Sequence, residues 1–288
     1  MDRRSGKNHP FLHASQRSVV FDLFGDYIRY SGGEIKLASL TALLSVFGFE
    51  PATVRVVMSR FRKEGWFDTR RDGRETVYAL NDRSYQLLDE GRARIFRRSD
   101  GTWGGRWTMV IYQVPEPDRA TRERLRKKLS WLGFGQLSPS TWIAPHDLFA
   151  EVRTLAAAEP AAAVDLLWCG TDDIDTDRTF VSRCWDLGQL SRDYVEFISS
   201  YSAMDDIEAN ALKDGRVALL ERMSIISDFR KFPFRDPQLP RELQPPDWPG
   251  PRAQRLFDDI HNQLADQANA YVSSIIGRPI NEPAPALM

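Results

Sequence analysis

Apolar residues recur at helical spacing in three successive segments near the amino terminus. The first two segments are residues 15–28 and residues 39–48, with Ser39 as the expected N-cap of the second helix. Residues 51–63 form the third predicted helix. Its buried stripe consists of Val54, Val57, Met58 and Phe61. Three amphipathic helices are therefore expected to open the chain.

A β-hairpin is predicted after the third helix. Residues 66–67 and 76–78 are its expected arms, and Asp72-Gly73 between them tolerates the positive φ of a tight turn. Three helices followed by a hairpin are typical of a winged helix-turn-helix, in which the third helix enters the major groove of DNA. We assign this domain to residues 15–98.

The middle of the chain alternates between strand and helix patterns. The glycines of residues 99–105 indicate a linker into a domain at residues 106–175. The predicted strands are residues 107–114, 136–138, 141–143 and 163–169, and the predicted helices are residues 118–132 and 148–158. This β-α-β-β-α-β order predicts a ferredoxin-like domain.

The last third of the chain is expected to be helical. Residues 176–276 carry apolar stripes that suit a core or a dimer surface, and they are predicted to form a domain for dimerisation and effector response. Proline is dense within residues 232–250, which favours an extended connection there. Residues 1–14 and 277–288 are expected to be flexible tails. The predicted fold class is therefore α+β with three domains.

Charge separates the amino-terminal domain from the rest of the chain. The formal net charge is −1, yet residues 1–98 contain 18 Lys or Arg against 12 Asp or Glu, and the other residues contain 21 against 28. A basic helix alone is as often a solvated surface as a binding surface, but the order of helices and hairpin favours duplex DNA. The residues predicted to contact operator DNA are Thr53, Arg55, Val56, Ser59, Arg60, Arg62, Lys63, Arg70, Arg71 and Arg74.

Motifs for catalysis and metal binding are missing from the sequence. The four histidines are scattered, and Cys169 and Cys184 lack metal-ligand spacing, so we expect no enzyme activity, no cofactor and no metal. The expected role of most histidines is at the surface or in structural hydrogen bonds. No apolar run of about 18 residues and no signal peptide occur, which predicts a cytoplasmic protein without a membrane partner.

Several short motifs together carry a family resemblance. They are residues 24–26, 32–34, 54–55, 63–66, 132–135, 236–240 and 247–250. In this order they resemble the phenylacetic acid degradation repressor family, PaaX, over nearly the whole chain. The resemblance implies a homodimeric transcriptional repressor with no catalytic residues. It also implies that an aromatic effector, typically the aryl-coenzyme A thioester phenylacetyl-coenzyme A, releases the operator.

The middle domain also resembles the small CRISPR-adaptation endoribonuclease fold. That fold's nuclease pattern has an aspartate where this chain has Gln113, and a neutral amide is a poor ligand for a hard metal ion. The resemblance therefore implies dimerisation or a structural role for this domain. An RNA-binding or RNA-processing protein that uses the middle domain is the alternative function.

Two further groups of basic residues have open roles. Arg119, Arg122 and Arg126 lie on one face of the predicted helix 118–132, which suits flanking DNA, a phosphorylated ligand or, preferably, a solvated surface. A pocket for the effector is expected in the helical third. Its predicted lining residues are Arg230, Lys231, Arg235 and Trp248.

Overall fold

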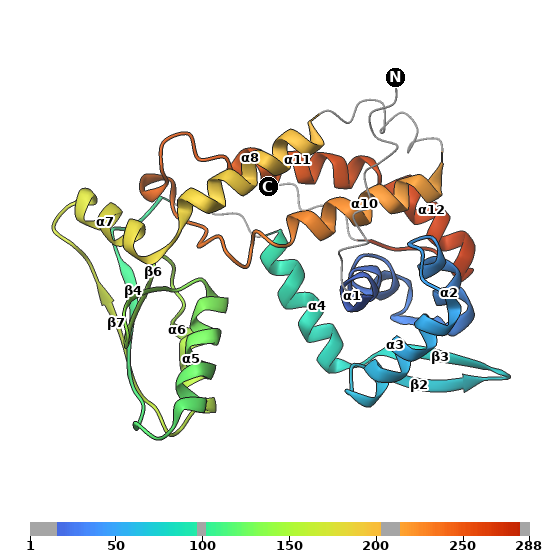
Figure 1. Ribbon diagram of the computed structural model, residues 1–288, viewed down its shortest axis with the longest axis horizontal. Coiled ribbons are helices and arrows are strands. Elements are labelled where there is room, and N and C mark those ends of the chain that lie inside the picture. Colours follow the sequence, from blue (N-terminus) through green and yellow to red (C-terminus); the bar gives the residue numbers. More distant parts are fainter. Residues whose placement is uncertain (1–15, 97–101, 203–213, 283–288) are drawn as a thin grey trace. The chain divides into compact units, whose positions relative to one another are not determined.

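The computed structural model describes residues 16–96, 102–202 and 214–282, which form helices and two antiparallel sheets (Figure 1). These residues divide into two compact units. The first unit contains the described residues up to Phe96, residues 197–230 and those from Arg252 onward, and the second contains the remainder. The predicted tail 1–14 lies outside the described residues. No described helix has both the length and the apolar character needed to cross a bilayer.

The amino-terminal part of the first unit contains helices around a three-stranded sheet. Its elements are α1 (Gln16–Asp26), η2 (Ile28–Ser31), β1 (Glu34–Lys36), α2 (Leu37–Ser45), α3 (Pro51–Lys63), β2 (Phe67–Asp72), β3 (Glu75–Leu80) and α4 (Asp82–Ile95). The strand order is β1-β3-β2. Helix α3 has the predicted bounds, whereas β1 and α4 were not predicted. Because β1 leads directly into α2, that helix begins at Leu37, and the prediction of Ser39 as its N-cap is wrong.

An aromatic cluster holds α1, α3 and the β2–β3 hairpin together. The rings of Phe24 and Phe67 lie 4.4 Å apart, and Phe61 contacts Phe67 edge-on at 5.8 Å. Val54 and Met58 are buried beside them, as the helical stripe predicts. Buried Phe side chains contribute strongly to stability, and here they fix the hairpin to the third helix.

The carboxyl-terminal helices belong to the same compact unit. They are the end of α8 (Leu187–Tyr201), α10 (Gly215–Phe229), α11 (Gly250–Gln263) and α12 (Ala265–Ile276). Helix α10 packs against α1 and α12. The boundaries of the two compact units therefore differ from those of the three predicted domains. The reason is that the apolar faces of these helices are buried against the amino-terminal elements. The apolar stripe after residue 250 is also interrupted at Leu264, where α11 ends and α12 begins.

The chain end is partly fixed, which differs from the expected tail at residues 277–288. Arg278 donates to the main-chain oxygen of Glu34, and the N–H of Asn281 donates to Tyr30. Glu282 forms an ion pair with Arg222. Residues 277–282 therefore pack on the first unit, because these polar groups find partners there.

The second unit contains a four-stranded sheet with two helices on one face. Its elements are β4 (Trp107–Gln113), α5 (Arg119–Leu132), β5 (Gly135–Ser138), β6 (Thr141–Ala144), α6 (Phe149–Ala158), β7 (Ala163–Cys169) and α7 (Ile174–Cys184). The strand order is β5-β6-β4-β7, and all neighbours are antiparallel. Leu125, Leu129 and Val152 pack on Val110. The first six elements occur where the sequence predicts them, to within a residue or so.

Two segments outside the predicted middle domain complete this unit. Helix α7 packs against β5, and the indole N–H of Trp107 donates to Asp177 of α7 at 2.7 Å. The proline-rich segment is extended only in part, because it also contains turns at residues 231–235 and 246–247 and the short helix η3 (Arg241–Leu243). The main chain of this segment contacts the ring of His146. The Nε2 atom of His146 lies 2.8 Å from the main-chain oxygen of Gln238. Residues 231–251 therefore belong to the second unit.

Candidate nucleic-acid interface

Helix α3 presents one face that carries no packing role. Val54, Met58 and Phe61 are buried, whereas Val56 on the opposite side is 69% exposed. Water does not stabilise an exposed apolar side chain such as valine, but this side chain can pack on the methyl group of thymine. Arg55, Arg62 and Lys63 are exposed. The outward face therefore offers one apolar contact among positive charges.

The β2–β3 hairpin lies beside α3 and adds a second basic surface (Figure 1). Gly73 at its tip has φ of +59°, a conformation that glycine adopts without strain. Arg71 and Arg74 are exposed close to this tip. Arg70 is exposed too, but it donates to both carboxylate oxygens of Glu34, which lowers the pKa of Glu34.

Most predicted DNA-contacting residues are accessible. Thr53 and Ser59 are half-buried and the other eight are exposed. Arg60 forms an ion pair with Glu64 at 2.8 Å, as Arg70 does with Glu34. Exposed ion pairs contribute about 0–1 kcal/mol, so phosphates can displace such partners at small cost.

Arg17 and Arg83 also lie at this surface, and sequence reasoning missed them. Both guanidinium groups lie over the ring of Trp66, at 5.4 Å and 3.8 Å from its centroid. Arg17 also pairs with Glu64 at 2.7 Å. Their place follows from packing of α1 and α4 around Trp66, which no local pattern indicates.

A buried group of charges joins α1 to the carboxyl-terminal helices. Arg222 of α10 lies 3.4 Å from Asp26 and 2.8 Å from Glu282, and its side chain is 1% exposed. Nε2 of His261 lies 3.1 Å from Asp26, which fulfils the expectation of a structural histidine. Burial alone would raise the pKa of Asp26, but Arg222 and His261 hold it well below its usual range.

The same group has spacing that a metal ion could use. Ligand atoms of Asp26, His261 and Glu282 lie within 4.8 Å of one another. However, the Arg222 guanidinium already supplies the positive charge between the two carboxylates. We therefore assign this cluster to stability.

Asp22 is a second buried carboxylate on α1. Its Oδ1 accepts from Arg230 at 3.0 Å, and its Oδ2 has no hydrogen-bond partner among the described residues. Burial raises its pKa from 3.8 to about 7, although Arg230 acts in the opposite direction. Between these two values the unfolded chain has released the proton while the folded protein retains it. Stability should therefore fall as pH rises through this window.

The Asp22→Asn variant is expected to lose this pH dependence. Each unit of pKa difference corresponds to about 1.4 kcal/mol, so the parent should lose a few kcal/mol that the variant does not. Urea denaturation at about pH 4.5 and about pH 8 measures the difference for both proteins. Exposed Asp68 provides a matched control as Asp68→Asn. Equal pH dependence in Asp22→Asn and the parent would contradict this explanation.

The four predicted effector residues do not form one pocket. Arg230 lies in the first unit and pairs with Asp22. Arg235 pairs with Asp193 at 2.5 Å and lines a cavity of the second unit. Trp248 packs edge-on against Tyr194 at 5.7 Å, and it does not line that cavity. Lys231 is exposed and lies outside the cavity lining as well. Only Arg235 of the four lines this cavity.

Three family models match successive parts of the chain. The model of a PaaX-like protein matches residues 15–84, that of the PaaX protein central Cas2-like domain matches residues 100–181, and that of the PaaX-like protein C-terminal domain matches residues 185–274. The chain belongs to the PaaX family. The resemblance in the sequence motifs is thereby confirmed.

Two relatives of this PaaX family member are informative. The transcriptional repressor PaaX of Escherichia coli (strain K12) is 33% identical over 281 residues, which cover 94% of this chain and 87% of that protein. The solved structure of the uncharacterized protein Rv0674 from Mycobacterium tuberculosis superposes with a TM-score of 0.59 at 24% identity. It covers 89% of this chain and 98% of that chain, and this likeness supports the fold alone.

Proposed function

We propose that this protein is a homodimeric transcriptional repressor of an aromatic catabolic operon, such as one for phenylacetate. The observation that carries the proposal is the basic, accessible face of α3 beside the basic hairpin. Similarity to a named repressor over 94% of the chain supports it and indicates a regulator rather than an enzyme. An aromatic effector, typically phenylacetyl-coenzyme A in this family, would release the operator.

The residues from α1 to β3 form a winged helix-turn-helix in this proposal. Helix α3 would enter the major groove, where Arg55 can pair with guanine and Val56 can contact a thymine methyl. Arg71 and Arg74 at the hairpin tip would contact flanking phosphates. Two copies in a dimer would read half-sites whose spacing matches the two-fold axis of the protein.

The second unit would act as a ferredoxin-like dimerisation or structural module. Its strand order β5-β6-β4-β7 with α5 and α6 supports this assignment. Gln113 ends β4, where the nuclease pattern has an aspartate. The amide offers no anionic oxygen to a metal ion, and this disfavours RNA cleavage.

Selection from a random pool of duplex DNA tests the proposal. The purified protein should enrich one sequence with two related half-sites, and it should bind that sequence better than a scrambled duplex at near-physiological salt. Single-stranded RNA should compete poorly. Absence of enrichment, or stronger competition by RNA, would overturn the proposed function.

Single alanine variants separate the roles of helix and hairpin. Arg55→Ala should cost about 1–3 kcal/mol on the selected sequence and much less on scrambled DNA, because a base contact is lost. Arg71→Ala should weaken both and flatten the salt dependence, because a phosphate contact is lost. Arg216→Ala, on the exposed side of α10, is the matched control. Fluorescence anisotropy at several salt concentrations measures all three, and equal losses on both duplexes for Arg55→Ala would contradict base reading.

A further inference from the structure

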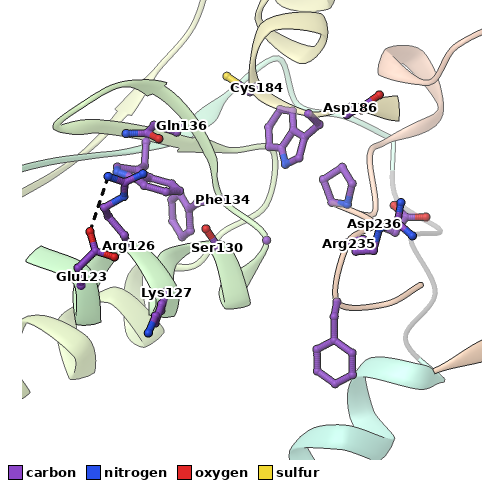
Figure 2. A pocket seen from close by; sticks show the side chains of 15 residues that line it. Glu123, Arg126, Lys127, Ser130, Phe134, Gln136, Cys184, Asp186, Arg235 and Asp236 are labelled. Carbon is purple, nitrogen blue, oxygen red and sulfur yellow. Dashed lines mark ion pairs between the residues drawn. The ribbon is translucent and has the colours of Figure 1, made fainter. Parts of the chain in front are cut away.

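The second unit contains a cavity of about 590 Å³ that the functions above leave unused. Helix α5 lines one side with Arg126, Lys127 and Ser130, and Arg235 and Asp236 lie on the other side (Figure 2). Phe134, Trp142, Trp185 and Phe234 also line it. The cavity therefore combines aromatic rings with basic side chains.

Its aromatic wall is built in advance of any ligand. Trp185 fits against Gly135, where an added Cβ would lie 2.7 Å from the indole ring. Trp185 also stacks on buried Trp107, with 6.3 Å between the ring centroids. Phe134 is 3% exposed and belongs to the core under α5. A flat apolar group can pack on this wall without rearranging it, which limits the entropic cost of binding.

The polar groups of the cavity favour an acceptor or an anion. The indole N–H of Trp142 is buried and has no acceptor among the described residues. Lys127 forms no ion pair within the described parts of the chain, and Arg126 lies 3.9 Å from Glu123, at the limit of an ion pair. Hydrogen-bond donors and positive charges thus remain available to a ligand.

Two carboxylates of the lining, Asp186 and Asp236, are already engaged in local hydrogen bonds. Asp186 accepts from the main chain of Gln189 at 3.0 Å. Asp236 accepts from the hydroxyl of Tyr194 and from the main chain of Gln238, both at 2.7 Å. Asp186 and Asp236 therefore stabilise the protein itself, whereas Glu123 of the same lining is exposed and lies 3.9 Å from Arg126. Lys127 is the basic side chain of the lining that has no carboxylate partner among the described residues.

We propose that this cavity binds the effector, and that the effector is an aromatic acyl compound with an anionic part. The inference rests on the proposed function. The aromatic ring would pack near Trp185 and Phe134, and the acyl oxygen would accept from the indole N–H of Trp142. Arg126 and Lys127 would meet the anionic part, which is a carboxylate in a free acid and phosphate in a coenzyme A thioester.

One of the points where the chain passes between the two units lies close to this cavity in sequence. It is the step from Arg230 to Lys231. Arg230 is held by Asp22 of α1, and Phe232 is held in the second unit by stacking on Tyr194 at 4.1 Å. The cavity lining begins only two residues later, at Phe234. A ligand that binds better to one arrangement of this segment would shift the population of DNA-binding states.

Calorimetry on the full chain tests the site with phenylacetate, phenylacetyl-coenzyme A and acetyl-coenzyme A. The Lys127→Glu variant should weaken thioester binding at least about tenfold, because it reverses a charge that meets the anion. Phe234→Ala should weaken binding of both aromatic probes. Lys128→Glu on the same helix lies outside the lining and serves as the matched control, with binding within about twofold of the parent. DNA affinity without effector should be unchanged in all three variants.

Each outcome separates the site from the proposed function. Binding of phenylacetate alone identifies a free acid as the effector, and binding of the thioester alone identifies the coenzyme A form; both support the cavity if Phe234→Ala weakens them. Selective DNA binding with no response to any probe overturns the cavity proposal and leaves repression intact. Unchanged probe affinity in Lys127→Glu and Phe234→Ala does the same. Absence of selective DNA binding in the parent overturns the proposed function instead.

Discussion

Replacing Arg222 with methionine is expected to lower the free energy of unfolding by about 3–5 kcal/mol, because a buried ion pair loses one partner. The guanidinium contacts Asp26 and Glu282, and its Nε donates to the main-chain oxygen of His261. Methionine fills a similar volume, so the loss measures unpaired charge rather than a cavity. Among the described residues, Asp26 would keep only His261 at 3.1 Å, and Glu282 only Arg92 at 4.0 Å.

Urea denaturation of the parent and three variants measures this effect. Arg216→Met, on the exposed side of the same helix, should change stability by less than about 0.5 kcal/mol. Arg222→Lys keeps the charge but cannot reach both carboxylates with a planar fork, so an intermediate loss is expected. If Arg222→Met were as stable as Arg216→Met, the cluster would not hold α1 to the carboxyl-terminal helices.

A double-mutant cycle examines the partnership directly. Asp26→Asn alone should destabilise the protein, because Arg222 and His261 lose a charged partner. When Asp26→Asn is added to Arg222→Met, it should lower the free energy of unfolding by less than it does in the parent. The reason is that the arginine that Asp26→Asn would leave unpaired is already absent. Strictly additive losses would show that the two side chains act independently, despite the 3.4 Å contact.

Local patterns predicted the elements that bury a strong periodic stripe. Helix α3 begins and ends where the sequence indicates, because Pro51 marks its start and its stripe of Val54, Met58 and Phe61 is buried. Strand β7 also has the predicted bounds, because it is a short apolar run interrupted only by Asp165. Strand β1 was missed because it has three residues, and its pairing with β3 depends on residues far along the chain. Helix α4 was missed because its stripe is weak, with Leu87 40% exposed.

The candidate sites also differ in whether local sequence patterns could predict them. The outward face of α3 could be read from helical geometry once its buried stripe was known. In contrast, Asp26 and Arg222 come from distant parts of the chain, and their pairing depends on how α10 packs against α1. A possible signal was an arginine within the apolar stripe of residues 219–226, since Arg is almost never buried without a partner. The cavity likewise combines α5 with residues 234–237, a proximity that periodicity cannot reveal.

Reversing two charges on α3 is expected to abolish selective DNA binding. The double variant Arg55→Glu with Arg62→Glu should lower affinity for the selected duplex by at least about 1000-fold, because two attractive contacts become repulsive. Both side chains are exposed, so the fold should tolerate the change. Fluorescence anisotropy measures the affinity, and urea denaturation checks the fold.

The decisive control carries the same change of net charge elsewhere in the first unit. Arg216→Glu with Arg255→Glu places two reversed charges on exposed sites of α10 and α11, outside the surface proposed to contact DNA. Charges beyond a Debye length of about 8 Å are largely screened at physiological salt, so this variant should lose less than about tenfold. Equal losses in the two double variants would mean that overall charge, and not the face of α3, governs DNA binding.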